Sequence, residues 1–526
     1  MKSKIFFFFI LLFALFGIID AGYLTYEHYQ QVIPPCTVNR FLPIFSDCGK
    51  VLRSSYSVMF GIPLSVAGVF QYSFLLIITV SLLIIKKSGL KPKFVRMLTY
   101  LLALQSMIGT IFSLYFIYIQ LVIIKSICLY CMLSAFISFV IFFLVLKISY
   151  VERFFFRLNI IEFIYKNILK PILFLLDPEF IHSVMTSFGE VIGKTYLRNF
   201  LNWKLKYLPL KLKQRILGIN FLGPIGLAAG FDYDAKLIHV LSSLSFGFQS
   251  VGTVTNLPYE GNPKPRLGRL SRSRSLMVNK GYKNIGVKNI VNKLNGHKFE
   301  IPLGVSIGSS NNEEIISSKD AIVDIIKSFS FFEKTRINIS YYEVNISCPN
   351  LINNKVDFFK SNNLDKLFQS LIKLKIKKPI FIKMPIDKNN QDFFKILKII
   401  SKYSFIKGVI IGNLFKDRKS PLLDKGELKK FKAGYFSGKP CEPRSNELIK
   451  LTYKKYKNSL LIIGCGGVFS GQDAYKKIRL GANLIQLITG MIFQGPQLIS
   501  QINMELEELL KKDGFSNIRQ VVGVDA

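Results

Sequence analysis

Two glycine-rich segments near the C-terminus, Ile462-Ile-Gly-Cys-Gly-Gly467 and Gln486-Leu-Ile-Thr-Gly490, indicate the fold of most of this chain. Each ends a short apolar run, as expected of neighbouring parallel strands joined by a helix. Glycines there let backbone N–H groups approach a phosphate, and the loops after the last two strands of a (β/α)₈ barrel are a common phosphate site. The alternative is that they only form tight turns. The spacing is not a dinucleotide fingerprint, because Phe469 breaks the GxGxxG pattern.

Short apolar runs separated by helical stretches continue through the C-terminal part of the chain, which indicates repeated βα units. Eight runs qualify as strands, and they span about 270 residues, the size of one α/β TIM (β/α)₈ barrel. The predicted strands are 225–229, 248–252, 303–307, 342–346, 380–384, 408–412, 460–463 and 484–487.

The N-terminal part is far more apolar and contains four segments long enough to cross a bilayer, which takes about 20 residues. They are Ile5–Tyr23, Val58–Ile85, Phe94–Ile124 and Cys128–Leu146. The first could be a secretory signal. Because three further spans follow and no Ala-x-Ala cleavage site is present, we interpret it as a retained helix. The sequence therefore predicts a membrane α-helical four-helix bundle ahead of the barrel.

Positive charge dominates the 526-residue chain, whose formal net charge is +37. A nucleic-acid partner is one explanation, but the lysines are spread along the C-terminal part without a basic arm. We therefore expect no nucleic acid and favour a surface beside anionic lipid headgroups. Lys and Arg residues flank the spans at 2–4, 86–96 and 147–157. With four spans these lie on one side, which the positive-inside rule makes cytoplasmic.

Four of the seven cysteines, Cys36, Cys48, Cys128 and Cys131, fall in the membrane part, all on the predicted outer side. Cys128 and Cys131 form a CxxC at the start of the fourth span. A helix N-terminus stabilises a thiolate, and a second pair in the loop could exchange with it. The alternatives are unrelated buried thiols or a structural zinc site, although two loop and two helix-mouth cysteines make an unusual zinc site. We expect redox cysteines and no metal.

These residues resemble the bacterial form of the vitamin K epoxide reductase family over about residues 5–148. The motifs that carry the resemblance are Gly17-Ile-Ile-Asp20, Asp47-Cys48-Gly-Lys, Phe60-Gly61-Ile-Pro63 and Cys128-Leu-Tyr-Cys131. The resemblance implies that Cys36 and Cys48 take electrons from outer substrates, that Cys128 exchanges with this pair, and that Cys131 meets a quinone. No second CxxC follows, so the expected outer partner is a separate thioredoxin-like thiol protein.

Two further strand ends of the barrel carry polar chemistry. Asn345-Ile-Ser-Cys348-Pro-Asn350 places two amides and a thiol in one loop, where a planar polar ligand could be bound and deprotonated. Lys383 ends another strand, where a cation could stabilise a reduced flavin. Taken alone, Cys348 is more often a buried small hydrophobe, and a strand-end lysine is more often solvated.

Together the barrel motifs resemble the quinone-linked (class 2) dihydroorotate dehydrogenases, over about residues 175–522. They include Asp177-Pro-Glu-Phe-Ile-His182, Gly226-Leu-Ala-Ala229-Gly230-Phe-Asp232, Gly261-Asn-Pro-Lys-Pro-Arg266-Leu-Gly-Arg269 and Ser437-Gly438. The resemblance implies catalysis by Cys348, a pyrimidine substrate held by Asn345, Asn350 and Asn413, and a quinone tunnel flanked by His182 and Arg269. It also implies FMN bound by Ala229, Gly230, Thr253, Lys383, Gly438, Gly466, Gly467, Thr489 and Gly490.

Several positions depart from the quinone-linked pattern. Cys348 is the base of the soluble class, where the quinone-linked class has serine. The family's lysine after Gly-Phe-Asp is Tyr233, and its Asn-Arg-x-Gly-Phe-Asn substrate loop is replaced by Val278-Asn-Lys280-Gly-Tyr-Lys-Asn284. Ser306 replaces an asparagine, and Ile488 replaces the tunnel tyrosine. Losing two substrate contacts could cost several kcal/mol, because a hydrogen bond to a charged ligand contributes about 1.5–3 kcal/mol.

The sequence thus predicts three regions: thiol–disulfide spans at 1–148, membrane-docking or interfacial helices at 149–207 and an FMN barrel at 208–526. The expected enzyme is a multi-pass oxidoreductase of a bacterial inner membrane, with its barrel cytoplasmic and its cysteine loop periplasmic. It would oxidise dihydroorotate and protein thiols, with ubiquinone or menaquinone as acceptor. The alternatives are a flavin barrel acting on another small cyclic substrate and a non-catalytic barrel attached to an active thiol module.

Overall fold

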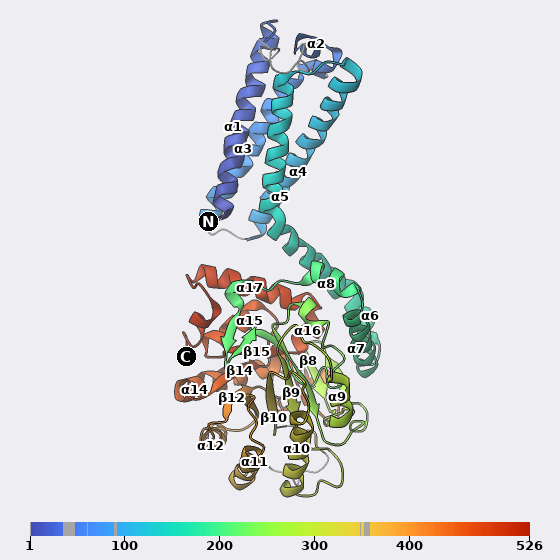
Figure 1. Ribbon diagram of the computed structural model, residues 1–526, viewed down its shortest axis with the longest axis vertical. Helices are drawn as coiled ribbons and strands as arrows, with labels where there is room; N and C mark the ends of the chain where they lie inside the picture. The colour runs from blue at the N-terminus through green and yellow to red at the C-terminus, as the bar shows by residue number, and fades with distance from the viewer. Residues whose placement is uncertain (1, 35–47, 60, 89–91, 348, 352–357) are drawn as a thin grey trace. The chain divides into compact units, whose positions relative to one another are not determined.

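Two structural units, Met1–Phe156 and Arg157–Ala526, make up the chain in the computed structural model. The structure describes all residues except 1, 35–47, 60, 89–91, 348 and 352–357. Figure 1 shows long helices in the first unit and a ring of strands surrounded by helices in the second.

The first unit is a bundle of four long apolar helices (Figure 1). Its elements are α1 (Lys2–Tyr29), α2 (Cys48–Leu52), β1 (Val58–Met59), β2 (Ile62–Pro63), α3 (Leu64–Ser88), α4 (Pro92–Tyr118), a π-helical turn at Ile119–Ile124 and α5 (Leu129–Ile164).

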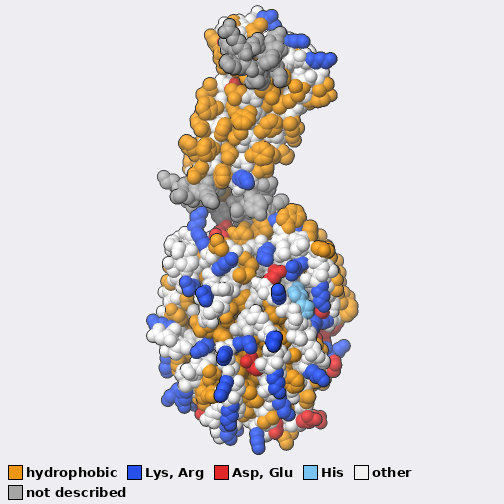
Figure 2. All heavy atoms as spheres, viewed as in Figure 1, with side chains coloured by type: hydrophobic (Ala, Val, Ile, Leu, Met, Phe, Trp, Pro, Cys, Tyr) orange, Lys and Arg blue, Asp and Glu red, His pale blue; other side chains and the backbone are white. Residues whose placement is uncertain are grey.

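Four segments of these helices are long and apolar enough to cross a membrane, which confirms the predicted spans: Ile5–Tyr29, Leu64–Ile85, Met97–Ile124 and Leu129–Ile148. Figure 2 shows hydrophobic side chains covering the visible side of this bundle. The second span begins later than predicted, because Val58–Met59 and Ile62–Pro63 pair as the antiparallel strands β1 and β2. The first part of the predicted interfacial segment 149–207 continues α5, which ends at Ile164.

The second unit is a closed barrel of eight parallel strands, which confirms the predicted TIM barrel. The ring order is β10-β11-β12-β14-β15-β5-β6-β9, which is chain order around the barrel. The strands are β5 (Ile225–Leu227), β6 (Phe248–Val254), β9 (Leu303–Ile307), β10 (Tyr341–Asn345), β11 (Ile380–Met384), β12 (Ile406–Ile411), β14 (Leu461–Cys465) and β15 (Leu484–Leu487).

Helices cover the outside of the ring (Figure 1), and strands such as β9 and β10 are therefore buried on both faces. The helices of this unit are α6 (Lys170–Leu175), α7 (Pro178–Lys194), α8 (Leu197–Leu205), α9 (Val287–Leu294), α10 (Ser318–Glu333), α11 (Ser361–Lys373), α12 (Asn390–Ile400), α13 (Lys425–Leu428), α14 (Glu442–Tyr456), α15 (Gly471–Arg479), α16 (Thr489–Gln494) and α17 (Leu498–Lys512).

The two ends of the barrel are closed differently. The hairpin of β3 (Gln214–Ile216) and β4 (Ile219–Phe221) packs Phe221 with Phe248 and Leu484, the first residues of two barrel strands. This fills the N-terminal end with apolar side chains. A three-stranded sheet of β7 (Leu267–Leu270), β8 (Ser275–Val278) and β13 (Tyr435–Phe436) is inserted between barrel strands. Val278 of this sheet lines a pocket formed by the C-terminal strand ends, so the polar chemistry belongs to that end.

Candidate active sites

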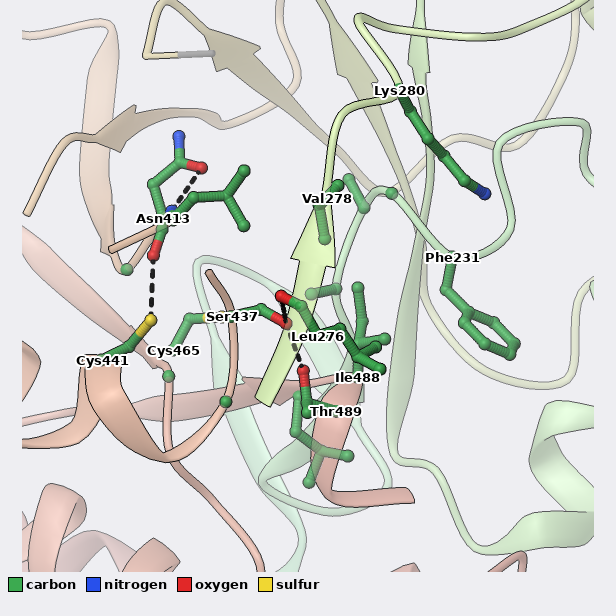
Figure 3. A pocket seen from close by; sticks show the side chains of 18 of the residues that line it. Phe231, Leu276, Val278, Lys280, Asn413, Ser437, Cys441, Cys465, Ile488 and Thr489 are labelled. Carbon is green, nitrogen blue, oxygen red and sulfur yellow. Dashed lines mark hydrogen bonds between the residues drawn. The ribbon is translucent and has the colours of Figure 1, made fainter. Parts of the chain in front are cut away.

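One pocket of about 200 Å³ lies at the C-terminal ends of the barrel strands. All nine residues predicted to bind FMN line it, and so do the three predicted substrate asparagines and His182. Figure 3 shows Asn413, Ser437, Thr489 and Lys280 reaching it from different elements. The parallel topology explains this convergence, because it brings the carboxyl ends of all eight strands to one end of the barrel.

The two glycines at the end of β14, Gly466 and Gly467, line the pocket. Gly466 and Gly467 have φ angles of +106° and +75°, a conformation that side chains disfavour. A Cβ added to Gly467 would lie 2.3 Å from the Cβ of Glu442. In the same pocket lining, the hydroxyls of Ser437 and Thr489 are 2.8 Å apart (Figure 3). Such a cradle of glycines and hydroxyls fits a phosphate group.

Lys383 ends β11 at the pocket and is only 7% exposed. Its ammonium makes no hydrogen bond or ion pair with any residue the structure describes. Inside the barrel, the Oε1 of Glu343 accepts hydrogen bonds from Ser250 and from Gln486, whose Nε2 lies 2.7 Å away. Burial raises the pKa of Glu343, while the charge of Lys383 opposes this shift. A buried ammonium beside the glycine cradle suits an anionic or reducible ligand.

The three asparagines meet above the strand ends and hold the surrounding loops. The Nδ2 of Asn345 donates to Thr253 Oγ1 at 2.9 Å, and that of Asn350 donates to the carbonyl of Val278 at 3.1 Å. The Nδ2 of Asn413 donates to the backbone carbonyl and the hydroxyl oxygen of Ser347, at 2.9 and 2.6 Å. Cys348, the predicted base, lies outside the described residues.

His182 of α7 lines the same pocket and is 9% exposed. Its Nε2 is 2.8 Å from the carbonyl of Phe231, and its ring stacks on Tyr233 at a centroid distance of 5.3 Å. The buried Nδ1 has no partner among the described residues. Burial lowers the pKa of His182 to about 3, with a further contribution from Lys280. The imidazole is therefore neutral at physiological pH.

Arg269, the other predicted quinone residue, does not line this pocket. Its guanidinium donates to the carbonyl oxygens of Phe174 and Leu176, at 3.2 and 2.7 Å, and lies 4.6 Å from the ring centre of Phe174. It thus holds the end of α6 to β7. Sequence reasoning missed Lys280 and Cys441 as pocket residues. The sequence did contain a sign of the role of Lys280: the family's lysine is replaced by Tyr233, and a lysine is present in the loop 278–284.

Three cysteines of the first unit, Cys48, Cys128 and Cys131, lie together at one end of its bundle. Cys48 and Cys128 are buried in one cluster with Val51, and Cys131 packs against it. Cys48 is disulfide-bonded, whereas Cys128 and Cys131 are free thiols. The amide N–H of Cys128 donates to Gln120 Oε1 at 2.9 Å. Cys36 lies outside the described residues.

Cys131 also lines a cavity of about 370 Å³ between the helices. Its polar lining includes Gln71, Tyr72 and Ser138, and the hydroxyls of Tyr72 and Ser138 are 2.9 Å apart. A thiol at the wall of a largely apolar cavity with a few polar groups suits an apolar ligand that carries carbonyl oxygens.

Two families of known proteins match the two parts of the chain. The Dihydroorotate dehydrogenase family profile matches residues 211–510. The chain belongs to the dihydroorotate dehydrogenase family. The Vitamin K epoxide reductase family profile matches residues 8–146, so the chain joins domains of two redox families. Proteins of both families are oxidoreductases, and the chain is accordingly an enzyme of that class.

Named relatives of the chain align with about two thirds of its length. Proteins named Dihydroorotate dehydrogenase (quinone) from Christiangramia forsetii and Buchnera aphidicola are each 36% identical to it, over 352 and 344 residues. These alignments cover 65% and 64% of this chain, and 99% and 98% of the relatives. The crystal structure of the Eimeria tenella enzyme with ferulenol is similar, with a TM-score of 0.57 and 26% identity over 66% of this chain and 96% of that one.

Proposed function

We propose that the barrel unit oxidises dihydroorotate to orotate with FMN as cofactor and a membrane quinone as acceptor. The observation that carries the proposal is the single pocket into which all nine predicted FMN residues and all three predicted substrate asparagines converge. The names of the relatives support the same reaction. FMN, when bound, supplies the two-electron acceptor.

The residues of the chain would bind the cofactor, orient the substrate and remove its proton. Gly466, Gly467 and Thr489 would hold the phosphate of FMN, and Lys383 would supply positive charge beside it. Asn345, Asn350 and Asn413 orient the pyrimidine ring, for which their amides would exchange the present internal hydrogen bonds. Cys348 takes the proton from C5 of the substrate as a thiolate.

Quinone is proposed to approach along the side of His182, where the pocket wall is formed by α7. The outward residues of α7 and α8 are large and apolar, including Phe180, Phe188 and Phe200, each more than half exposed. Helices of this kind suit the membrane surface, where ubiquinone or menaquinone is dissolved. Arg269 supports this entrance through the carbonyls of α6 and the turn that follows it.

The experiment uses the full chain purified in detergent. We expect a yellow protein with an oxidised-FMN absorbance spectrum that bleaches with dihydroorotate and forms orotate when a short-chain quinone is added. Lys383→Met is the matched variant and should lower orotate formation at least 100-fold. A flavin-containing protein that is inert towards dihydroorotate would disprove the proposed substrate, and a protein without flavin would disprove the cofactor.

For the first unit we propose oxidation of protein thiols coupled to reduction of the same quinone pool. Electrons would pass from an outer thioredoxin-like protein to a Cys36–Cys48 disulfide, then to Cys128 and Cys131, and finally to quinone. The disulfide state of Cys48 and its packing with Cys128 support this order. Cys131→Ser should abolish disulfide formation in secreted proteins; an unchanged level would disprove the role.

The proposed location is the inner membrane of a bacterium, crossed several times by the first unit. The support is the four membrane-capable helices together with Lys and Arg at residues 2–4, 86–96 and 147–157. This distribution puts the barrel on the cytoplasmic side and the cysteines on the periplasmic side. Protease treatment of intact spheroplasts should therefore spare the barrel.

A second substrate is favoured by one observation: Val278 and Tyr233 line the pocket where the resembled family has substrate-binding polar residues. Another small cyclic compound could then be the natural substrate. Val278→Asn distinguishes the two. Equal or higher turnover of dihydroorotate supports the first proposal, while loss of the activity measured with a different cyclic compound supports the second.

A further inference from the structure

Lys280 is a buried cation that has no counterion among the residues the structure describes. It lies in the loop after β8, lines the barrel pocket and is 7% exposed. Its Nζ lies 4.4 Å from the ring centre of Tyr233 and forms no hydrogen bond or ion pair with any described residue. Figure 3 shows its amine end directed to the side of the pocket where Phe231 lies. Burial of an ammonium that contacts only the face of a ring costs free energy, and an anionic ligand would lower this cost.

Glu179 is the carboxylate with the strongest electrostatic effect on Lys280, but it already forms ion pairs with two other cations. Glu179 Oε1 pairs with Arg266 at 3.2 Å and with Lys283 at 3.1 Å. Burial alone would raise the pKa of Glu179, but these two partners hold it below its usual value. Asp234, the other acid, accepts the N–H of Ile285 at 3.2 Å.

The remaining groups beside Lys280 add no negative charge. His182 is neutral at physiological pH, and burial raises the pKa of Tyr233 so far that its phenol stays protonated. Lys280, Lys283 and Arg266 therefore outnumber the carboxylates Glu179 and Asp234. The local surplus of positive charge, enclosed in a pocket, makes this a site for an anion.

We propose that Lys280 binds the carboxylate of the pyrimidine substrate, in place of the cation that the resembled family carries at position 233. The inference rests on the proposed function. The loop that carries Lys280 is fixed to the substrate asparagines on both sides: the hydroxyl of Tyr282 donates to the carbonyl of Asn345 at 2.8 Å, and Asn350 donates to Val278. Tyr233 stands where the resembled family has a lysine, so one cation is missing at that position. The ammonium of Lys280, which lies over the ring of Tyr233, replaces this cation.

The protonation of Lys280 gives the proposal a signature in pH. Burial, assisted by Lys283 and Arg266, lowers the pKa of Lys280 to about 7, while Glu179 and Asp234 oppose the shift. A bound carboxylate favours the charged amine and so raises its pKa. Binding is therefore strongest below pH 7 and weakens by up to about tenfold per unit as the pH rises above 7.

The test is calorimetric titration of the full-length FMN-containing protein with orotate and with uracil, which lacks the carboxylate. Lys280→Met should weaken orotate binding at least tenfold and leave uracil binding unchanged. Lys280→Arg should retain orotate binding and lose its pH dependence between 6 and 9, because arginine stays protonated. Lys288→Met, which removes an exposed lysine of α9, is the control and should match the wild type.

The outcomes separate this inference from the function on which it rests. Equal orotate affinity in wild type and Lys280→Met overturns the role of Lys280 alone. If the variant in addition has a raised KM for quinone, Lys280 belongs to the quinone site and not to the substrate site. Failure of the wild-type protein to bind orotate overturns both. If Lys280→Met does not fold, the wild-type profile decides: orotate affinity that is flat from pH 6 to 9 contradicts the proposal.

Discussion

Under the proposed function, Gly467 helps to hold the phosphate of FMN. Gly467 combines a φ of +75° with a would-be Cβ contact of 2.3 Å to Glu442. We expect Gly467→Ala to lower FMN affinity at least tenfold, because the loop must move away from the ligand. Gly296→Ala is the matched control, since Gly296 has a φ of +76° but no heavy atom near its would-be Cβ. Both variants carry a backbone strain of about 1 kcal/mol, so equal FMN content, measured by absorbance, would contradict the cradle.

His182 makes the stability of the barrel unit depend on pH. Its pKa is about 3 in the folded protein and about 6.5 in an unfolded chain, so the unfolded chain binds the proton more strongly. The contribution of His182 to the free energy of unfolding is thus fully present above pH 6.5. It decreases as the pH falls towards 3, and about 2 kcal/mol of it is lost at pH 5. The fluorescence of Trp203, the only tryptophan, reports unfolding of this unit.

The matching variant is His182→Phe, which keeps an aromatic ring beside Tyr233. Its unfolding free energy should fall less than that of the wild type between pH 7.5 and pH 5, by about 2 kcal/mol. Parallel pH profiles of the two proteins would show that His182 is not a buried neutral group.

At the scale of elements, the start of α7 carries the pocket residue His182 and also Glu179, which pairs with Arg266 and Lys283. Asp177 caps this helix, with its Oδ1 accepting the N–H of Phe180 at 2.8 Å. Asp177→Ala should therefore destabilise the barrel unit by about 1 kcal/mol, and Asp177→Asn, which keeps the acceptor, should cost much less. The measurement is chemical unfolding followed by Trp203 fluorescence. Equal losses in both variants would assign the effect to charge instead of to the cap.

The elements themselves follow closely from local sequence. Every predicted barrel strand overlaps an observed one, because fully buried parallel strands are short continuous apolar runs. Boundaries were less predictable: Val58–Met59 and Ile62–Pro63 are apolar enough to extend a span, yet they pair as β1 and β2. The start of the segment 149–207 is helical as predicted, but local pattern does not show that α5 continues into it as far as Ile164.

At the scale of the whole molecule, two redox units share one chain, and each contains its own cavity. We expect their activities to be separable. Cys131→Ser should remove thiol oxidation and leave orotate formation within twofold of wild type, whereas Lys383→Met should do the reverse. Both rates are measured on the same full-length preparations in liposomes that contain quinone. A parallel loss of both activities in either variant would contradict independent units.

The sequence by itself determined the two-part organisation, the four apolar spans and the eight-stranded barrel, because hydrophobic length and period are local properties. It also predicted the strand-end residues of the pocket, since parallel topology brings those ends together. The charge of Lys280, the neutrality of His182 and the position of Arg269 away from the pocket required the tertiary structure. Burial and pairing set the energy of a charge, and both depend on residues distant in sequence, such as Glu179 with Arg266 and Lys283.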